Sequence, residues 1–192
     1  MKVNAMIVSV LVAGMAWSMG VSKAMAEEIQ YHDSDSGTFS PSTIDYNEDG
    51  SPGAIGIGAG KSTQGNTSHH FFSENDTALI WPNVKCPEGT FEFAVVRARS
   101  VRRFPTGDLL VDEINPGKGI GSGFSCITVH PDLSITFTST VTGEWTGGTG
   151  RFANATGPVT VYSSGTVLVT DPTTGVVFGS YESSAEGTVI LP

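Results

Sequence analysis

Polar and apolar side chains alternate along residues 134–145 (SITFTSTVTGEW), and this period of two constrains the fold more than any other feature. The residues at 136, 138, 140 and 142 are all threonine, whereas Ile135, Phe137, Ser139 and Val141 fall on the other face. Such alternation is typical of a β-strand that packs one face and leaves the other polar. The run therefore predicts a half-buried strand.

Similar extended runs recur along the chain, and turn signals separate them. Residues 90–104 are rich in β-branched and aromatic types, a Pro-Thr-Gly-Asp turn follows at 105–108, and residues 108–114 resume the extended pattern, which predicts a hairpin. No convincing amphipathic helix is evident, and the 24 glycines and 10 prolines are too many for a helical bundle. Seven or eight such strands predict a β-sandwich or a closed antiparallel barrel, and closure is favoured because it removes exposed strand edges.

The N-terminal residues have the three-part layout of a secretory signal peptide. Lys2 precedes an apolar run from Ala5 to Val21, and Ala24-Met25-Ala26 forms a small-x-small cleavage site. A retained membrane anchor is the alternative, but the apolar run is short for a span. The sequence thus predicts a signal peptide at 1–26, a polar lead-in at 27–36 and one barrel domain at 37–192. It also predicts a secreted or periplasmic location with no membrane span after cleavage.

Charge and cysteine content fit an exported protein. The chain has 19 acidic and 10 basic residues, and cleavage removes Lys2 and Lys23 but no acid, so the net charge falls from −9 to −11. Nucleic acid is therefore not expected as a partner, because basic surfaces bind it. Cys86 and Cys126 are expected to form a disulfide in an oxidising compartment, with two free buried cysteines as the alternative.

The most distinctive motif is the glycine-rich stretch GGTGRFANATG at residues 147–157, between two strand-like runs. Its glycines permit positive φ and tight turns, and Phe152 supplies an anchor for packing. The stretch resembles the GGTGxF-x-x-A-x-G signature of dirigent proteins and the related turn of allene oxide cyclases. It is most similar to that of their exported bacterial relatives with an allene-oxide-cyclase-like barrel. By motif, the resemblance covers the last third of the chain.

That resemblance implies an all-β fold, a single closed antiparallel barrel of about eight strands with a central apolar cavity, allene-oxide-cyclase-like or calycin-like. Plant members guide the cyclisation or coupling of small apolar molecules mainly by confining them, and they form trimers. Three functions follow as hypotheses: a binding module for a small apolar molecule without strong catalysis, a cyclase or isomerase that acts by confinement, and a structural surface protein with a filled barrel. The motif transfers fold more securely than activity and assigns no catalytic residue. An oligomer is compatible with the sequence but not required by it.

Four residues are candidates for ligand contacts in such a cavity. Arg97 and Arg99 could hold an anionic or carbonyl-bearing ligand, with a solvated strand end as the alternative. Glu144 and Tyr162 could also face the cavity, where burial raises the pKa of a carboxyl group and permits acid–base chemistry. On a regular strand, Arg97 and Arg99 share a face with the apolar residues at 91, 93 and 95, and Arg102 points the other way.

Metal sites have only one candidate. Asp45, Asn47 and Asp49 place oxygen ligands at alternate positions before a glycine, an arrangement that suits calcium. The twelfth position, where an EF-hand has a bidentate glutamate, is Gly56, so the alternatives are a loop with structural calcium and a plain acidic turn. No other cofactor is required. The histidines show no metalloenzyme spacing, and His69 and His70 would point to opposite faces of a strand.

Overall fold

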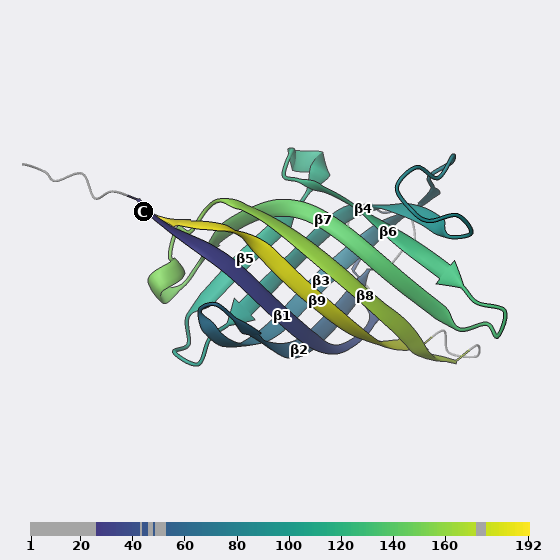
Figure 1. Cartoon of the computed structure of the whole chain (residues 1–192), viewed down its shortest axis with the longest axis horizontal. Coiled ribbons are helices and arrows are strands. Elements are labelled where there is room, and N and C mark those ends of the chain that lie inside the picture. The colour runs from purple at the N-terminus through teal and green to yellow at the C-terminus, as the bar shows by residue number, and fades with distance from the viewer. Residues whose placement is uncertain (1–25, 43, 46–47, 49–52, 172–175) are drawn as a thin grey trace, which may run out of the picture.

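The computed structural model describes residues 26–42, 44–45, 48, 53–171 and 176–192, which form nine β-strands and two short 3-10 turns without an α-helix (Figure 1). Within these ranges, no helix is long and apolar enough to cross a membrane. The predicted signal peptide lies outside the described residues except for Ala26. The strands are β1 (Glu27–Pro41), β2 (Ala54–Ser62), β3 (Gly65–Leu79), β4 (Phe91–Arg103), β5 (Leu109–Ile114), β6 (Ser122–Val129), β7 (Ile135–Gly148), β8 (Pro158–Asp171) and β9 (Val176–Leu191).

The nine strands belong to one antiparallel sheet that returns on itself. Its order is β3, β2, β1, β9, β8, β7, β5, β4 and β6, and an additional pairing between β3 and β4 joins distant parts of that order. Eight strands thereby form a ring, while β6 pairs with both β4 and β7. The prediction of an all-β, antiparallel fold is confirmed, as is the hairpin, because β4 and β5 pair from Ala98 with Ile114 to Arg103 with Leu109.

Residues 27–36, expected as a polar lead-in, instead form the first part of β1, which pairs with both β2 and β9. Tyr31, Asp33 and Asp35 alternate along this segment, and all three are buried. The lead-in prediction fails because it equates polar side chains with exposed ones. Here the polar side chains that face inward have buried partners: Asp33 pairs with Arg102, and Asp35 with His69.

A β-bulge in β4 changes which of its side chains face the interior. One step along β3, from Glu74 to Asn75, corresponds to two steps along β4, so Val96 is an extra residue. Val95 is buried before the bulge and Arg102 is buried after it, although their positions differ by an odd number. The regular alternation expected along this strand is therefore wrong. The inward-facing arginine is Arg102.

An apolar cluster fills the interior at one end of the ring. Tyr31, Trp145 and Phe152 are buried in it together with residues from β5, β8 and β9. Phe152 belongs to the 147–157 motif, which supplies the second 3-10 turn (Gly150–Phe152) close to the C-terminus (Figure 1). Gly150 has a φ of 58°, and a Cβ there would collide with the Asp108 side chain. The motif is thus a packing element that covers this end.

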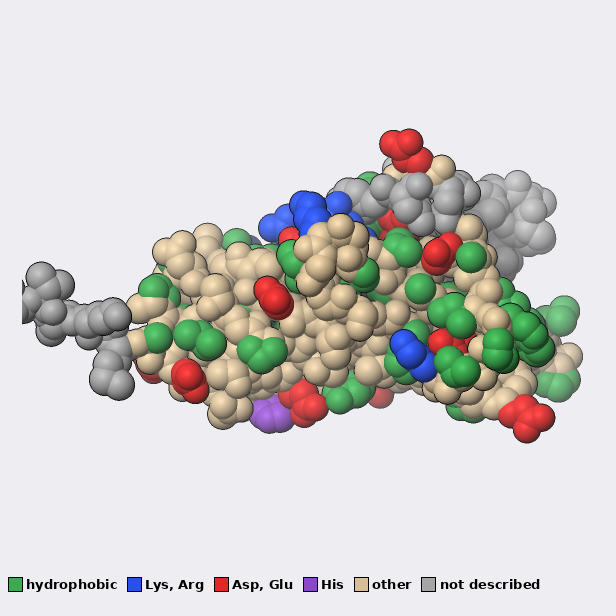
Figure 2. Space-filling model, turned by 90° about the horizontal axis from the view of Figure 1, so that it is seen from above, with side chains coloured by type: hydrophobic (Ala, Val, Ile, Leu, Met, Phe, Trp, Pro, Cys, Tyr) green, Lys and Arg blue, Asp and Glu red, His purple; other side chains and the backbone are tan. Residues whose placement is uncertain are grey.

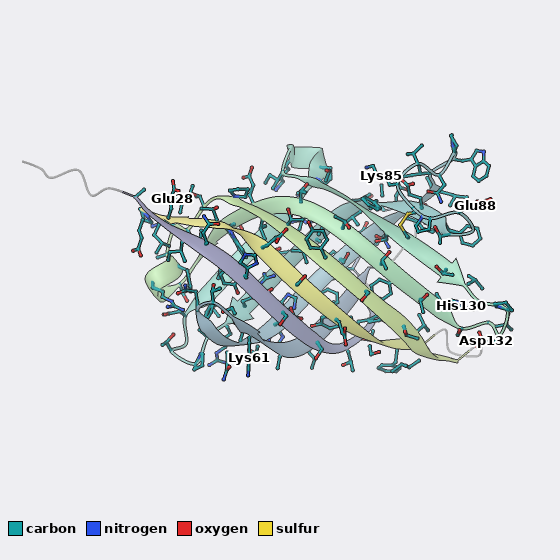
Figure 3. All side chains as sticks on the ribbon, in the orientation of Figure 1. Glu28, Lys61, Lys85, Glu88, His130 and Asp132 are labelled. Carbon is teal, nitrogen blue, oxygen red and sulfur yellow. A yellow bond between two sulfur atoms is a disulfide. The ribbon has the colours of Figure 1, made fainter. Side chains whose placement is uncertain are left out.

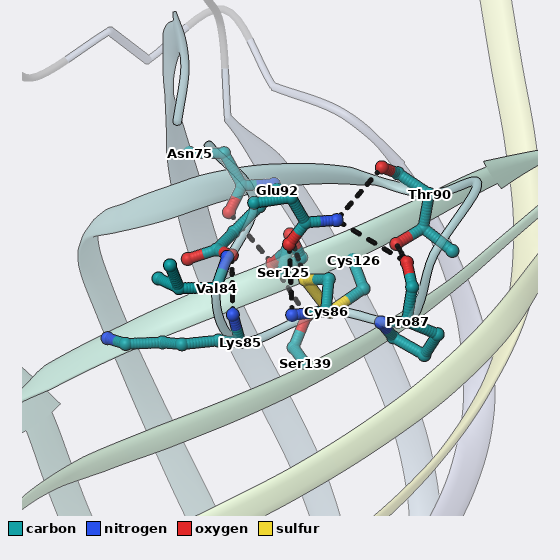
Figure 4. Close-up of a disulfide and its surroundings, with 11 residues drawn as sticks. Asn75, Val84, Lys85, Cys86, Pro87, Thr90, Glu92, Ser125, Cys126 and Ser139 are labelled. Carbon is teal, nitrogen blue, oxygen red and sulfur yellow. Dashed lines mark hydrogen bonds between the residues drawn. A yellow bond between two sulfur atoms is a disulfide. The ribbon is translucent and has the colours of Figure 1, made fainter. Parts of the chain in front are cut away.

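The predicted disulfide between Cys86 and Cys126 is present and joins the loop before β4 to β6 (Figure 4). Beside it, a carboxylate oxygen of Glu92 accepts hydrogen bonds from the amides of Val84 (3.0 Å) and Lys85 (2.8 Å). These amides, that of Lys85 foremost, hold the pKa of Glu92 below its usual value. The loop before β4 is therefore fastened by one covalent bond and by backbone contacts to a buried carboxylate.

Candidate functional site

A cavity of about 550 Å³ lies inside the ring. Two exposed residues, Pro41 and Thr77, are among those that line it, so it reaches the surface. Its walls are mainly apolar and come from all nine strands. The apolar side chains include Phe39, Phe71, Phe93, Ile114, Ile127, Phe137, Val161 and Val167.

Exposed apolar side chains gather at one end of the molecule, on the right in Figure 2. Trp81 and Val84 lie in the loop before β4, Leu133 lies in the turn between β6 and β7, and all three are more than 70% exposed. Figure 3 places this loop and this turn, through Lys85 and His130, at the end of the ring away from Glu28. The ring therefore has an end filled by the Phe152 cluster and an end rimmed by apolar side chains.

A row of serine hydroxyls crosses the cavity wall. Ser125, Ser139, Ser163 and Ser183 stand opposite one another on β6, β7, β8 and β9, and Asp35 of β1 continues the row. All four serines line the cavity, and the Oγ atoms of Ser125 and Ser139 are 2.7 Å apart. The apolar cavity thus has one polar band along its wall.

Asp35 is the centre of a hydrogen-bonded cluster at the end of this row. Its Oδ1 lies 2.8 Å from His69 Nδ1, and its Oδ2 accepts a hydrogen bond of 2.8 Å from Ser183 Oγ. The Tyr181 hydroxyl lies 3.4 Å from the same His69 nitrogen. His69, Tyr181 and Ser183 all line the cavity, so three strands (β1, β3 and β9) place this polar cluster at its wall.

Hydrogen bonding fixes the ionisation of the cluster. Burial by itself raises the pKa of Asp35, but hydrogen bonds from His69, Ser183 and Tyr181, with electrostatic attraction to His69, outweigh burial and leave this pKa below its usual value. Burial, followed by the nearby Asp35 carboxylate, raises the pKa of Tyr181 far above its usual value. Asp35 is therefore a carboxylate and Tyr181 a neutral phenol at neutral pH. Because a carboxylate only accepts hydrogen bonds, the proton between Asp35 and His69 resides on Nδ1.

Glycines on β2 make room for these side chains. Gly58 stands opposite His69 in the register of β2 and β3, and a Cβ on Gly58 would lie 2.4 Å from the Tyr181 hydroxyl. A Cβ on Gly56 would lie 2.1 Å from the Phe71 ring. Alternate glycines thus leave the inner face of β2 bare, and side chains from the neighbouring strands occupy the space.

A buried charged layer lies between the polar cluster and the Phe152 cluster. Arg102 forms ion pairs with Asp33 of β1 and Asp112 of β5, and its Nη1 donates a 2.6 Å hydrogen bond to Ser100 Oγ. Burial alone lowers the pKa of Arg102, but attraction to Asp112 and Asp33 raises it above its usual value, so the guanidinium stays charged. Ser100 and Asp112 also line the cavity and form part of its floor.

The residues predicted for ligand contact lie mostly outside the cavity. Arg97 is in an ion pair with Glu113, at 3.6 Å, and Arg99 is exposed and reaches only the cavity's edge. Glu144 is exposed on β7. Tyr162 is exposed on β8 and donates a 3.3 Å hydrogen bond to Glu186. The bulge moves the arginines, and the alternation of β7 and β8 turns the other two outward.

The predicted calcium loop falls largely outside the described residues. Asn47 and Asp49 are not described, and only Asp45 of the three proposed ligands is. In the described part of the chain, no group of three or more His, Cys, Asp or Glu side chains is placed to hold a metal ion. Calcium binding by this loop stays a prediction.

Sequence reasoning missed the residues that the structure gathers at the cavity. Asp35 had a usable signal, because Tyr31, Asp33 and Asp35 recur with the period of a strand. His69 had none, since its partner Asp35 lies 34 positions away along the chain and on a different strand. The two side chains meet because β1 and β3 both pair with β2, whose glycines leave the space between them free.

Comparison with known proteins adds no family to this picture. The chain matches no protein-family model, no curated protein and no solved structure. The resemblance to dirigent proteins and allene oxide cyclases therefore rests on the motif at 147–157 and not on a detected relative.

Proposed function

We propose that the protein binds a small, mostly apolar molecule inside its ring of strands. The observation that carries this proposal is the cavity of about 550 Å³ with apolar walls and one polar band. Ligand pockets typically measure roughly 300–1,000 Å³ and combine apolar walls with a few polar groups that set orientation. Apolar burial contributes roughly 25 cal/mol per Å² to binding, and the serine row supplies the orienting groups.

The same cavity favours a binding role over a purely structural one. Small barrels are commonly filled by their own side chains, which leaves no space for a ligand. Here Gly58, Ser163 and Ser183 occupy inward positions where large side chains would fill the ring. The apolar rim with Trp81 and Leu133 also suits the entry of an apolar molecule from water.

We further propose that the ring is a closed barrel of the allene-oxide-cyclase and dirigent type, in a secreted or periplasmic protein. The antiparallel ring of eight strands and the motif at 147–157 support the kinship, and the disulfide is compatible with export. Cyclisation or isomerisation of the bound molecule is the second candidate function. The cluster of Asp35, His69 and Tyr181 at the cavity wall favours it.

Binding is tested by native mass spectrometry of protein from its own host, together with titration of purified protein with the neutral apolar fluorophore N-phenyl-1-naphthylamine. Val167→Trp places a bulky ring inside the cavity, whereas Leu168→Trp changes the exposed neighbouring residue. We expect Val167→Trp to weaken fluorophore binding about 10-fold or more, because the new ring takes the place of part of the fluorophore. A loss of about 1.4 kcal/mol of binding free energy corresponds to a factor of 10 in affinity. Leu168→Trp should leave binding unchanged.

Two results would contradict the binding proposal. One is the absence of saturable fluorophore binding together with the absence of a co-purifying small molecule. The other is equal affinity of the wild type, Val167→Trp and Leu168→Trp, which would place the fluorophore on the outer surface.

A further inference from the structure

We infer that His69 and Asp35 form a general-base dyad that removes a proton from a carbon atom of the molecule bound in the cavity. The inference rests on the proposed binding function and gives it a reaction class. The substrate class is a mostly apolar compound with a carbonyl, or a comparable electron-withdrawing group, next to an acidic C–H bond.

Asp35 fixes the orientation and the tautomer of His69. The side chains are 4% and 1% exposed, and His69 Nδ1 lies 2.8 Å from Asp35 Oδ1. Because Asp35 is an acceptor, neutral His69 carries its proton on Nδ1 and keeps a lone pair on Nε2. The rings of Phe71 and Tyr181 contact the imidazole, with centroids 5.8 Å and 6.2 Å away. The imidazole is thus held in one tautomer, with its lone pair on one defined nitrogen.

That nitrogen has no hydrogen-bond partner among the described residues. His69 Nε2 is buried and makes no hydrogen bond with any residue of the described chain. Leaving a buried polar atom unpaired costs about 1–3 kcal/mol, which a purely structural histidine would avoid by pairing both nitrogens. Other atoms of His69 line the cavity, and a bound molecule becomes the partner of the buried Nε2 when the side chains that cover this nitrogen move apart.

The groups around the imidazole suit proton transfer. Asp35 from β1 and Tyr181 from β9 face it, and the ion pairs of Arg102 with Asp33 and Asp112 form the next layer. The Asp35 carboxylate stabilises the imidazolium that forms when Nε2 gains a proton. The hydroxyls of the serine row line the same cavity and can donate hydrogen bonds to an oxygen that gains negative charge.

The chemical step balances without an oxidant or a reductant. The Nε2 lone pair takes the proton, the electrons of the C–H bond form a C=C bond, and the electrons of the carbonyl π bond move to oxygen. In a substrate with a C=C bond next to the carbon that loses the proton, the anion is a dienolate. The imidazolium then returns the proton to the far carbon of that C=C bond, which restores the carbonyl and shifts the C=C bond into conjugation with it. The net reaction is an isomerisation, and His69 returns to its neutral form.

The compound 5-nitrobenzisoxazole tests for this base because it is small, mostly apolar and has one acidic C–H bond. Removal of its C3 proton breaks the N–O bond and gives a coloured cyanophenolate. We expect the purified protein to convert it about 100-fold faster than an equal concentration of imidazole, within the usual range for a positioned base. His69→Gln should abolish this acceleration, and Asp35→Asn should reduce it about 10-fold or more because the imidazolium loses its counter-charge.

Matched measurements separate the dyad from binding. His130→Gln removes a histidine in the β6–β7 turn and should leave the rate unchanged, whereas Val167→Trp should lower the rate with the dyad intact. Binding of 6-nitrobenzotriazole, an isostere without an N–O bond to break, is measured in parallel by calorimetry. Binding of the isostere without accelerated conversion overturns the dyad and leaves the binding function standing. Absence of both overturns both, and conversion that survives His69→Gln in a folded variant places the base elsewhere.

Discussion

At the scale of single residues, the interior of this protein depends on a charge that is shielded from water. Arg102 is fully buried, and the carboxylates of Asp33 and Asp112 both contact it. A buried ion pair adds little when compared with a well-packed apolar replacement, but removing one partner leaves the other charges uncompensated. The guanidinium is therefore needed because two acids are buried beside it.

Arg102→Met removes the positive charge and leaves Asp33 and Asp112 buried together. We expect the free energy of unfolding in urea to fall by about 3–5 kcal/mol. Arg103→Met, which changes the exposed neighbour, should stay within about 0.5 kcal/mol of the wild type. Similar losses in the two variants would contradict the role of the buried charge.

The ionisation of Asp35 makes the free energy of unfolding depend on pH. Because its pKa is lower in the folded protein than in the unfolded chain, its stabilising contribution is complete above the unfolded value of about 3.9 and is lost as pH falls through the folded pKa. Asp35→Asn should therefore be less stable than the wild type at pH 7. The difference between their free energies of unfolding should become smaller toward pH 2. Urea midpoints measured across this range, with the exposed Glu182→Gln as the control, give the comparison. A gap that stays constant with pH would exclude this carboxylate as a source of the dependence.

At the scale of strands and loops, regular alternation was the part of the fold that the sequence could predict. β7 follows it, with Phe137 and Val141 at the cavity, and the β4–β5 hairpin lies where its turn residues indicate. The Val96 bulge was not predictable, because pairing with β3 creates it and nothing in the local pattern marks it. The residues of the candidate site could not be identified from the sequence for the same reason, since each of its contacts joins residues from different strands.

The loop before β4 depends on its disulfide. The double variant Cys86→Ser/Cys126→Ser opens a loop with a sequence separation of 40, for which chain entropy predicts a loss of about 4 kcal/mol in the free energy of unfolding. Urea unfolding of the oxidised wild type and of the variant measures this difference. Reduced wild type should match the variant, and a variant as stable as the oxidised protein would show that the Glu92 contacts suffice.

At the scale of the whole molecule, stability and binding are assigned to different ends of the ring. Phe152→Ala opens a hole in the apolar cluster and should lower the free energy of unfolding by about 3–5 kcal/mol. The affinity for N-phenyl-1-naphthylamine at a temperature where the variant is folded should equal that of the wild type. An altered affinity would show that the two ends are coupled across the Arg102 layer.

The Arg102 layer also bears on how such a scaffold can diversify. The ion pairs of Arg102 with Asp33 and Asp112 separate the apolar cluster around Phe152 from the cavity. Substitutions among the phenylalanines and serines that line the cavity can therefore change which ligand binds without destabilising the Phe152 cluster. Natural or engineered variants can thus differ in ligand preference and keep the same stable ring.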